Sequence, residues 1–227
     1  MSSLERYRRP ADIPAPFPVF PLRGAILLPR ASMPLNIFEP RYLEMIDDVL
    51  SGSRVLGIIQ PAESRAESES PTGKATDLRT VGCAGRLTAY QELDDGRLLI
   101  TITGIARFAV ASEVATDKPY RIAMPNFANY LDDFEASAGE DDVDRERLVS
   151  VLKVYLEKRQ IRTNLKAING ASTEFLVNTL SVISPYGPEE KQALLEARDL
   201  RQRAEILVAL AEMDIAGGGG DGGQTLQ

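Results

Sequence analysis

The chain has 227 residues, of which 44% are hydrophobic and 26% charged, a composition typical of a globular protein with an ample core. Its formal net charge of −7 argues against a broad nucleic-acid footprint, which would need a basic face. The absence of histidine excludes a histidine-based catalytic triad, a histidine-containing zinc site and a histidine proton shuttle.

The termini and the single cysteine indicate where the protein works. Residues 1–16 contain basic side chains with no apolar stretch behind them, so we expect a flexible leader and not a secretory signal. Cys83, the only cysteine, excludes an intramolecular disulfide and suits a reducing compartment. No apolar run approaches the roughly 18–20 residues that span a bilayer. We therefore expect a cytoplasmic protein that does not contact membranes.

The first predicted elements are a strand, a helix and a second strand. Residues 17–22 are apolar but contain Pro18 and Pro21, which cannot donate to a sheet ladder, so this strand is predicted at an edge or a barrel rim. Pro40 stands where a first helical turn tolerates proline, and apolar residues recur at helical spacing from there to Gly52. The β-branched run that follows predicts one buried strand.

The next region predicts an antiparallel sheet. Asp94, Asp95 and Gly96 form a strong hairpin signal, and Gly104 interrupts the alternation of the return strand, which indicates a bulge or a sharp bend. The expected strands cover residues 81–90, 97–103, 105–110 and 120–127. Together with the earlier strands they predict a small β-barrel over residues 17–128.

Three polar segments are expected to be irregular. Residues 63–74 predict a mobile loop, and the glycine-rich residues 216–227 predict a disordered tail. Residues 129–144 predict an acidic linker. Their carboxylates lack the spacing and central glycine of a calcium loop, so we interpret them as a solvated charge run. These carboxylates belong to Asp132, Asp133, Glu135, Glu140, Asp141 and Asp142.

The last part, residues 145–215, predicts a bundle of about four α-helices. Ser172 is the expected N-cap of a helix that buries Phe175, Pro188 suits the first turn of the next helix, and Asp199 is the expected N-cap of the last. The arginines near the start of that last helix could form a local basic patch, but we interpret them as a solvated helix face: Arg198, Arg201 and Arg203.

Six sequence stretches resemble the Lon protease N-terminal domain family over residues 17–210: FPVFPL, FEPRYLEMID, VLGIIQP, VGCAGRL, GIARF and PYGPEEKQALLEARDLRQRAEIL. The resemblance implies an α+β fold, with an N-terminal PUA-like β pseudo-barrel followed by the helical bundle. It also implies recognition of polypeptide without catalysis. The chain has no G-x-x-x-x-G-K-[ST] phosphate loop, and nothing after residue 130 resembles the family's serine–lysine peptidase.

We therefore expect a free-standing member of that family, without ATPase or peptidase domains, that binds unfolded or partner protein as an adaptor, holder or regulator of proteolysis. We expect neither a cofactor nor a metal, and the oligomeric state is left open. Two alternatives belong to other classes. One is an RNA-binding PUA-like module, which the acidic balance disfavours, and the other is an ATP-independent hydrolase, which the lack of histidine and of a family catalytic motif disfavours.

The candidate partner-binding residues lie at the predicted junction between strand and helix. Phe38, Glu39, Arg41 and Tyr42 combine an arginine with aromatic side chains, as recognition surfaces often do. The alternative is that Glu39 and Arg41 pair with each other and fix the junction. Arg107 is a further candidate, which faces a partner or caps the barrel end. For Cys83 we expect a small buried residue and not a reactive thiol.

Overall fold

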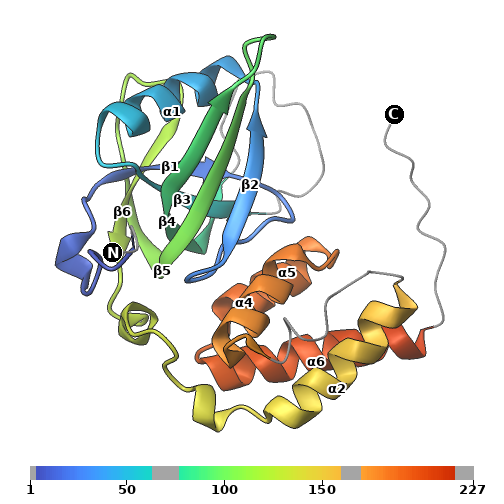
Figure 1. Cartoon of the computed structure of the whole chain (residues 1–227). Coiled ribbons are helices and arrows are strands. Elements are labelled where there is room, and N and C mark those ends of the chain that lie inside the picture. The colour runs from blue at the N-terminus through green and yellow to red at the C-terminus, as the bar shows by residue number, and fades with distance from the viewer. Residues whose placement is uncertain (1–3, 63–76, 160–169, 218–227) are drawn as a thin grey trace.

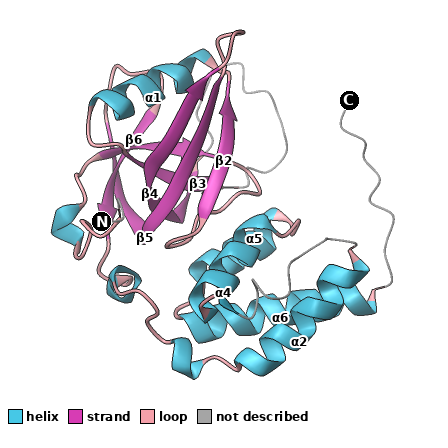
Figure 2. Ribbon diagram, in the orientation of Figure 1, coloured by secondary structure: helices cyan, strands magenta, loops and turns pink. Residues whose placement is uncertain are grey.

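A computed structural model describes residues 4–62, 77–159 and 170–217. A β-barrel with one helix against it lies above a group of helices in Figure 1, and Figure 2 separates the two kinds of element by colour. The predicted loop at residues 63–74 and the tail from residue 218 lie outside the described residues. Within the described residues, no helix combines the length and the apolar character needed to cross a bilayer.

The barrel is built from one six-stranded sheet with the order β2-β5-β4-β3-β1-β6. Because β5 also pairs with β6, five of the strands form a closed ring, and β2 is attached to the outside of that ring through β5. Only β1 and β3 pair in parallel; the other pairs are antiparallel. The strands are β1 Phe17–Pro21, β2 Ser32–Ile37, β3 Val55–Pro61, β4 Leu78–Glu92, β5 Leu98–Val114 and β6 Arg121–Asn126.

Of the two positions predicted for the first strand, a sheet edge or a barrel rim, the sheet edge is wrong, because β1 lies between β3 and β6. Its two prolines are tolerated because β1 pairs with each neighbouring strand over only part of its length, and the two paired parts share one residue. Residues 17–19 pair with β6 and residues 19–21 pair with β3, so Pro18 faces only β6 and Pro21 faces only β3. Each proline therefore interrupts at most one ladder.

The bulge predicted at Gly104 is confirmed, since the β4–β5 register shifts opposite this residue. The strands predicted on either side of it form one continuous strand, β5. A side chain at this position would overlap the carbonyl group of Leu28, so the close approach of that loop requires glycine. The loop is held there because Gly104 donates to the Ala31 carbonyl at 2.9 Å.

Five α-helices occur in the described part of the chain: α1 Pro40–Ser51, α2 Arg145–Lys158, α4 Thr173–Ile183, α5 Pro188–Glu196 and α6 Leu200–Ala216. The predicted caps are confirmed: Ser172 accepts from the Phe175 amide at 3.2 Å, and Asp199 accepts from the Gln202 amide at 2.8 Å. Pro188 occupies the first turn of α5. Phe175 differs from the prediction, since its side chain lies on the outer side of α4 and is 50% exposed.

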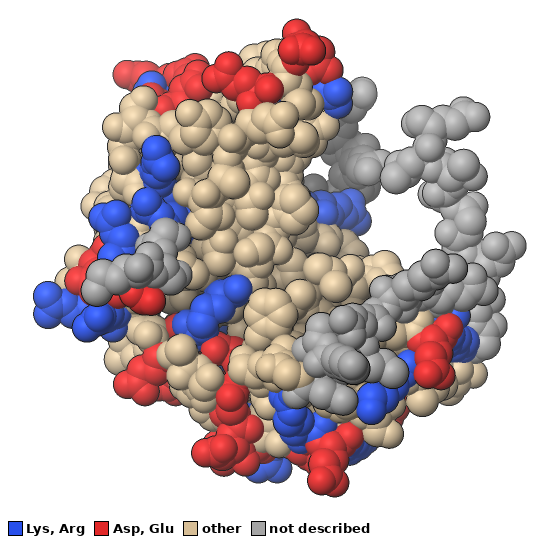
Figure 3. Space-filling view, viewed as in Figure 1, with Lys and Arg blue, Asp and Glu red and all other residues tan. Residues whose placement is uncertain are grey.

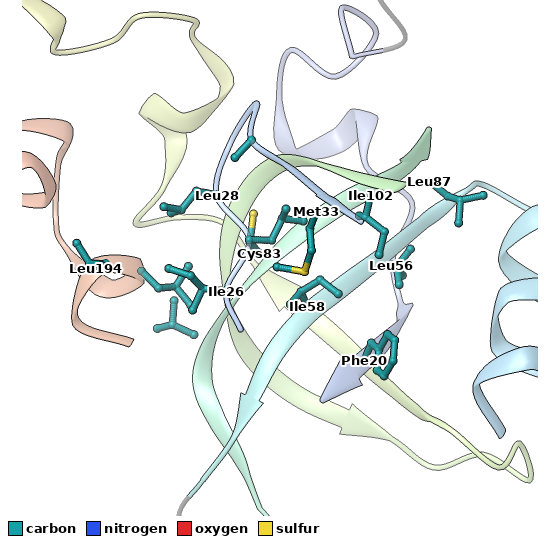
Figure 4. Packing of buried hydrophobic residues seen from close by; sticks show 14 of the residues in the cluster. Phe20, Ile26, Leu28, Met33, Leu56, Ile58, Cys83, Leu87, Ile102 and Leu194 are labelled. Atoms are coloured by element: carbon teal, nitrogen blue, oxygen red, sulfur yellow. The ribbon is translucent and has the colours of Figure 1, made fainter. Parts of the chain in front are cut away.

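One hydrophobic cluster joins the barrel to the helices. Figure 4 shows Ile26, Leu28 and Cys83 of the barrel region beside Leu194 of α5, and all four are buried. The predicted arrangement of a pseudo-barrel followed by a helical bundle is therefore confirmed, and the two parts share a core. The barrel and the bundle are not separately packed units.

Two segments predicted as irregular are ordered by packing. In the predicted leader, Tyr7 and Ile13 are buried in a second cluster at the barrel, so residues 4–13 do not form a flexible leader. The predicted acidic linker contains two short 3-10 helices, η2 Leu131–Phe134 and η3 Glu140–Asp142. Asp133 in η2 is buried, because it pairs with an arginine of the sheet. Only part of this acidic run is therefore a solvated charge run.

Candidate functional site

The junction between β2 and α1 holds three of the predicted residues at the surface. Phe38 lies between the two elements and is 64% exposed. Glu39 occupies the N-cap position of α1, and its carboxylate pairs with Arg41 at 2.8 Å without capping the helix. The Arg41 guanidinium lies over the Tyr42 ring, 4.5 Å from its centre. The expected Glu39–Arg41 pair therefore exists, and Phe38 is exposed next to it.

Tyr42 belongs to the core and not to the surface of this junction. Its side chain is buried, and its ring centre lies 4.2 Å from that of Phe20 on β1. Burial raises the pKa of the Tyr42 hydroxyl. A residue held in this way fixes the position of α1 on the barrel, so the exposed part of the predicted site consists of Phe38, Glu39 and Arg41.

Replacing Arg41 with alanine should change the free energy of unfolding by less than ~1 kcal/mol, because an ion pair between exposed side chains contributes little. Chemical denaturation of the Arg41→Ala variant measures this value. A loss of several kcal/mol would instead show that the pair with Glu39 holds the junction together.

Next to this junction, the outer face of the β2–β5–β4 part of the sheet carries uncharged side chains. Side chains opposite each other on paired strands lie on the same face, so Asn36, Leu99 and Gln91 form one row. We call this region the uncharged face; it consists of Ser32, Pro34, Asn36, Thr88, Ala89, Gln91, Leu99, Thr101 and Thr103. Strands β2, β4 and β5 face the viewer in Figure 1, and Figure 3 shows a broad tan surface there with charged side chains at its borders.

The uncharged face is apolar at one end and hydroxyl-rich at the other. Leu99 is exposed, and Phe38 follows β2 on the side where alternation places Asn36. At the opposite end the hydroxyl of Thr103 lies 3.2 Å from that of Ser32 and 3.0 Å from that of Thr88. These hydroxyl groups satisfy one another, so the face can pack against an uncharged chain without leaving them unpaired.

Strand β2 also offers an open edge, since β5 is its only partner among the described strands. Gly104 donates to the Ala31 carbonyl, so alternation directs the backbone groups of Ser32, Pro34 and Asn36 toward the open edge. Pro34 has no N–H group to donate there, which limits the pairing of an added strand. An added strand could therefore pair with only part of this edge.

The structure places Arg107 away from the other candidates, in the interior between sheet and helices. Arg107 as a whole residue is 3% exposed. The guanidinium donates to Asp133 through Nε at 2.9 Å and Nη2 at 2.8 Å, and through Nη1 to the carbonyls of Leu195 and Ala197. Burial lowers the pKa of Arg107, but the bonds to Asp133 outweigh it and raise the pKa overall. This geometry favours the internal role for Arg107, and we leave it out of the proposed binding surface.

The cysteine and the arginines at or just before the start of α6 contribute no exposed chemistry beyond ion pairs. Cys83 is fully buried, as expected, and burial raises the pKa of its thiol, so a reactive thiolate is disfavoured. Arg198 and Arg201 are exposed and paired, with Asp199 and Glu205. Arg203 differs from the prediction because it is buried and donates to the Leu194 carbonyl at 2.9 Å. Among the described residues there is no cluster of metal-binding side chains.

Sequence reasoning did not identify the uncharged face as a candidate site. The one sequence signal for this face was the alternation in residues 97–103, which placed Leu99, Thr101 and Thr103 on the same side of a strand. Its extension onto β2 and β4 depends on strand pairing, which the sequence does not specify.

Comparisons with known proteins agree on one family. The family model described as the ATP-dependent protease La (LON) substrate-binding domain matches residues 16–212. The chain is 28% identical over 208 residues to a Lon protease of Anaeromyxobacter dehalogenans, an alignment that covers 88% of this chain and 23% of that protein. It is 23% identical to the Lon protease of Escherichia coli over 87% of this chain and 25% of that protein. The chain thus spans only a small part of these relatives' length.

Two solved structures have the same fold. The Lon N-terminal domain protein from Xanthomonas campestris has a TM-score of 0.59 at 21% identity, covering 86% of this chain and 98% of that one. The N-terminal domain of Mycobacterium avium complex Lon protease has a TM-score of 0.64 at 17% identity, covering 86% of this chain and 97% of that one. At this identity the similarity extends to the fold alone.

Proposed function

The chain belongs to the family of the ATP-dependent protease La (LON) substrate-binding domain, and on that premise we propose that it is a non-catalytic module that recognises polypeptide. Its ligand in this proposal is unfolded protein or an unstructured segment of a partner. The module would present this ligand as an adaptor, holder or regulator of proteolysis. The proposal includes no ATPase or peptidase activity of this chain.

The observation that carries the proposal is the uncharged face beside Phe38. An exposed apolar side chain at each of two neighbouring positions, Phe38 and Leu99, can bind apolar side chains of an extended chain. The amide groups of Asn36 and Gln91 lie on the same face and can hydrogen-bond to its backbone. A folded globular protein exposes few apolar side chains next to unpaired backbone groups, whereas an unfolded chain exposes both. A face that offers apolar contacts together with amide groups therefore favours unfolded polypeptide as its ligand.

Replacing Phe38 and Leu99 together with alanine should weaken the binding of unfolded polypeptide by about tenfold or more, because aromatic and aliphatic anchors carry much of the binding free energy of an interface. Fluorescence anisotropy with a labelled, reduced and alkylated protein measures the dissociation constant. Both side chains are exposed, so the melting temperature of the variant should stay close to that of the wild type.

Phe175→Ala is the matched control, since Phe175 is a similarly exposed phenylalanine on α4 in the helical part of the chain. This variant should bind as the wild type does. Equal binding by the wild type and the Phe38→Ala, Leu99→Ala variant would move the site away from the uncharged face. An absence of polypeptide binding by the wild type itself would contradict the proposed function.

A further inference from the structure

Arginines that lack a carboxylate partner lie together at one border of the uncharged face. No carboxylate of the described residues pairs with Arg6, Arg54 or Arg86, which we call the arginine patch. Many arginines elsewhere on the surface are paired with a carboxylate: Arg41 with Glu39, Arg97 with Asp95, Arg147 with Glu212 and Arg201 with Glu205. A grouping of unpaired positive charge is unexpected in a chain whose net charge is −7.

Contacts through Tyr7 hold the patch together. Arg86 Nη1 donates to the Tyr7 hydroxyl at 3.0 Å and lies 3.4 Å from the Ser53 carbonyl oxygen. The Arg6 guanidinium lies 5.3 Å from the centre of the Tyr7 ring. Arg54 follows Ser53, and its carbonyl accepts from the Leu87 amide at 2.8 Å, which places its backbone beside that of Arg86. Buried Tyr7 thus fixes two of the arginines on the barrel.

The patch is continuous with the uncharged face. Arg86 on β4 pairs with Thr103 on β5, and Thr103 pairs with Ser32 on β2, so these three side chains lie in one row on the outer face. Figure 3 shows lysine and arginine side chains, with some acidic side chains among them, along the left border of the tan surface, on the side of the N-terminal segment. A chain lying across the uncharged face from Phe38 would therefore reach the arginine patch at its far end.

We infer that the arginine patch binds acidic residues that flank the uncharged segment of a bound polypeptide, an inference that rests on the proposed function. Guanidinium groups that have no carboxylate partner within the described residues can form charge-assisted bonds to the aspartate and glutamate carboxylates of a ligand. Only three arginines take part, and the protein is acidic overall, so a long phosphate backbone would meet repulsion beyond the patch. The charged part of a short acidic peptide segment is about as small as the arginine patch, so such a segment fits the patch better than a nucleic acid does.

Two synthetic peptides with the same apolar, uncharged core test this inference, one followed by three glutamates and the other by three glutamines. At low ionic strength the wild type should bind the glutamate peptide about tenfold more tightly, because each exposed ion pair contributes a modest amount. The Arg6→Glu, Arg54→Glu variant should reduce this preference to less than about twofold. A salt concentration near 1 M should abolish the preference of the wild type for the glutamate peptide, while both peptides still bind through their apolar, uncharged segment.

Arg86 is left unchanged because it supports Tyr7, and Arg147→Glu is the control for an added negative charge on the helices. That control should keep the preference for the glutamate peptide. Equal binding of both peptides by the wild type would overturn the inference and leave the proposed function standing, whereas binding of neither would overturn both. An RNA oligonucleotide that binds more tightly than the glutamate peptide, and loses that binding in the Arg6→Glu, Arg54→Glu variant, would overturn the assignment to polypeptide.

Discussion

A chain that ends at Phe127 should fail to form a cooperatively folded barrel. Ile26 and Leu28 are buried beside Leu194 of α5, and they would be exposed to water if the helices were removed. Each large aliphatic side chain loses roughly 1.5–3 kcal/mol on exposure, against a total stability of about 5–15 kcal/mol for a typical protein. Exposure of this shared cluster alone would therefore cancel much of the barrel's free energy of unfolding.

The polar groups at the same boundary add to the expected loss. Gln60 on β3 donates to the Pro188 carbonyl at 2.9 Å and to the Gln192 side chain at 3.0 Å, and both partners belong to α5. Without α5 the Gln60 amide group loses both acceptors and is hydrated instead, so the fragment loses the net contribution of about 0.5–1.5 kcal/mol that each such hydrogen bond makes to stability. The fragment should therefore expose apolar surface and aggregate.

Thermal unfolding followed by circular dichroism compares residues 4–127 with residues 4–217 and with the whole chain. The control of residues 4–217 keeps every described element and should melt as cooperatively as the whole chain. Recovery of a cooperative transition on adding residues 128–217 in trans would support the shared core. A barrel fragment that melts cooperatively at the temperature of the whole chain would show that the barrel is an independent domain.

Replacing Arg107 with methionine should destabilise the protein by about 3–5 kcal/mol, because the Asp133 carboxylate would stay buried without its positive partner. The same substitution removes the donors to the carbonyls of Leu195 and Ala197, which connect β5 to the end of α5. In a protein of this size the loss corresponds to a decrease of roughly 10 °C in melting temperature.

Urea denaturation of the Arg107→Met variant measures the loss, and the Arg41→Ala variant is the control for an exposed arginine–carboxylate pair. Substituting both members, as Arg107→Met with Asp133→Leu, should recover part of the stability, since no buried charge is then left unpaired. A single Arg107→Met variant whose melting temperature lies within about 2 °C of the wild type would contradict this account. It would show that water reaches the pair.

The features that the sequence determined are those that depend on neighbours along the chain. The caps at Ser172 and Asp199 and the bulge at Gly104 follow from side chains or backbone freedom within a few residues, and the structure has them where they were predicted. A region of strands followed by a region of helices was also predictable, because the period of apolar residues changes from two to 3.6 after the sheet region, and the family resemblance implied the pseudo-barrel. The resemblance in six short stretches identified the family over the range that the family model matches.

Contacts between distant segments decided the rest. Tyr7 is buried because it joins the second hydrophobic cluster of the barrel, and Phe175 is exposed because none of the described elements covers its side of α4. Arg107 and Asp133 are far apart along the chain, and from the sequence alone each would be predicted to lie at the surface. Only the fold brings them together as a pair in the interior. The uncharged face likewise exists only through the register of three strands, since alternation fixes which residues share a side of one strand but not which strands become neighbours.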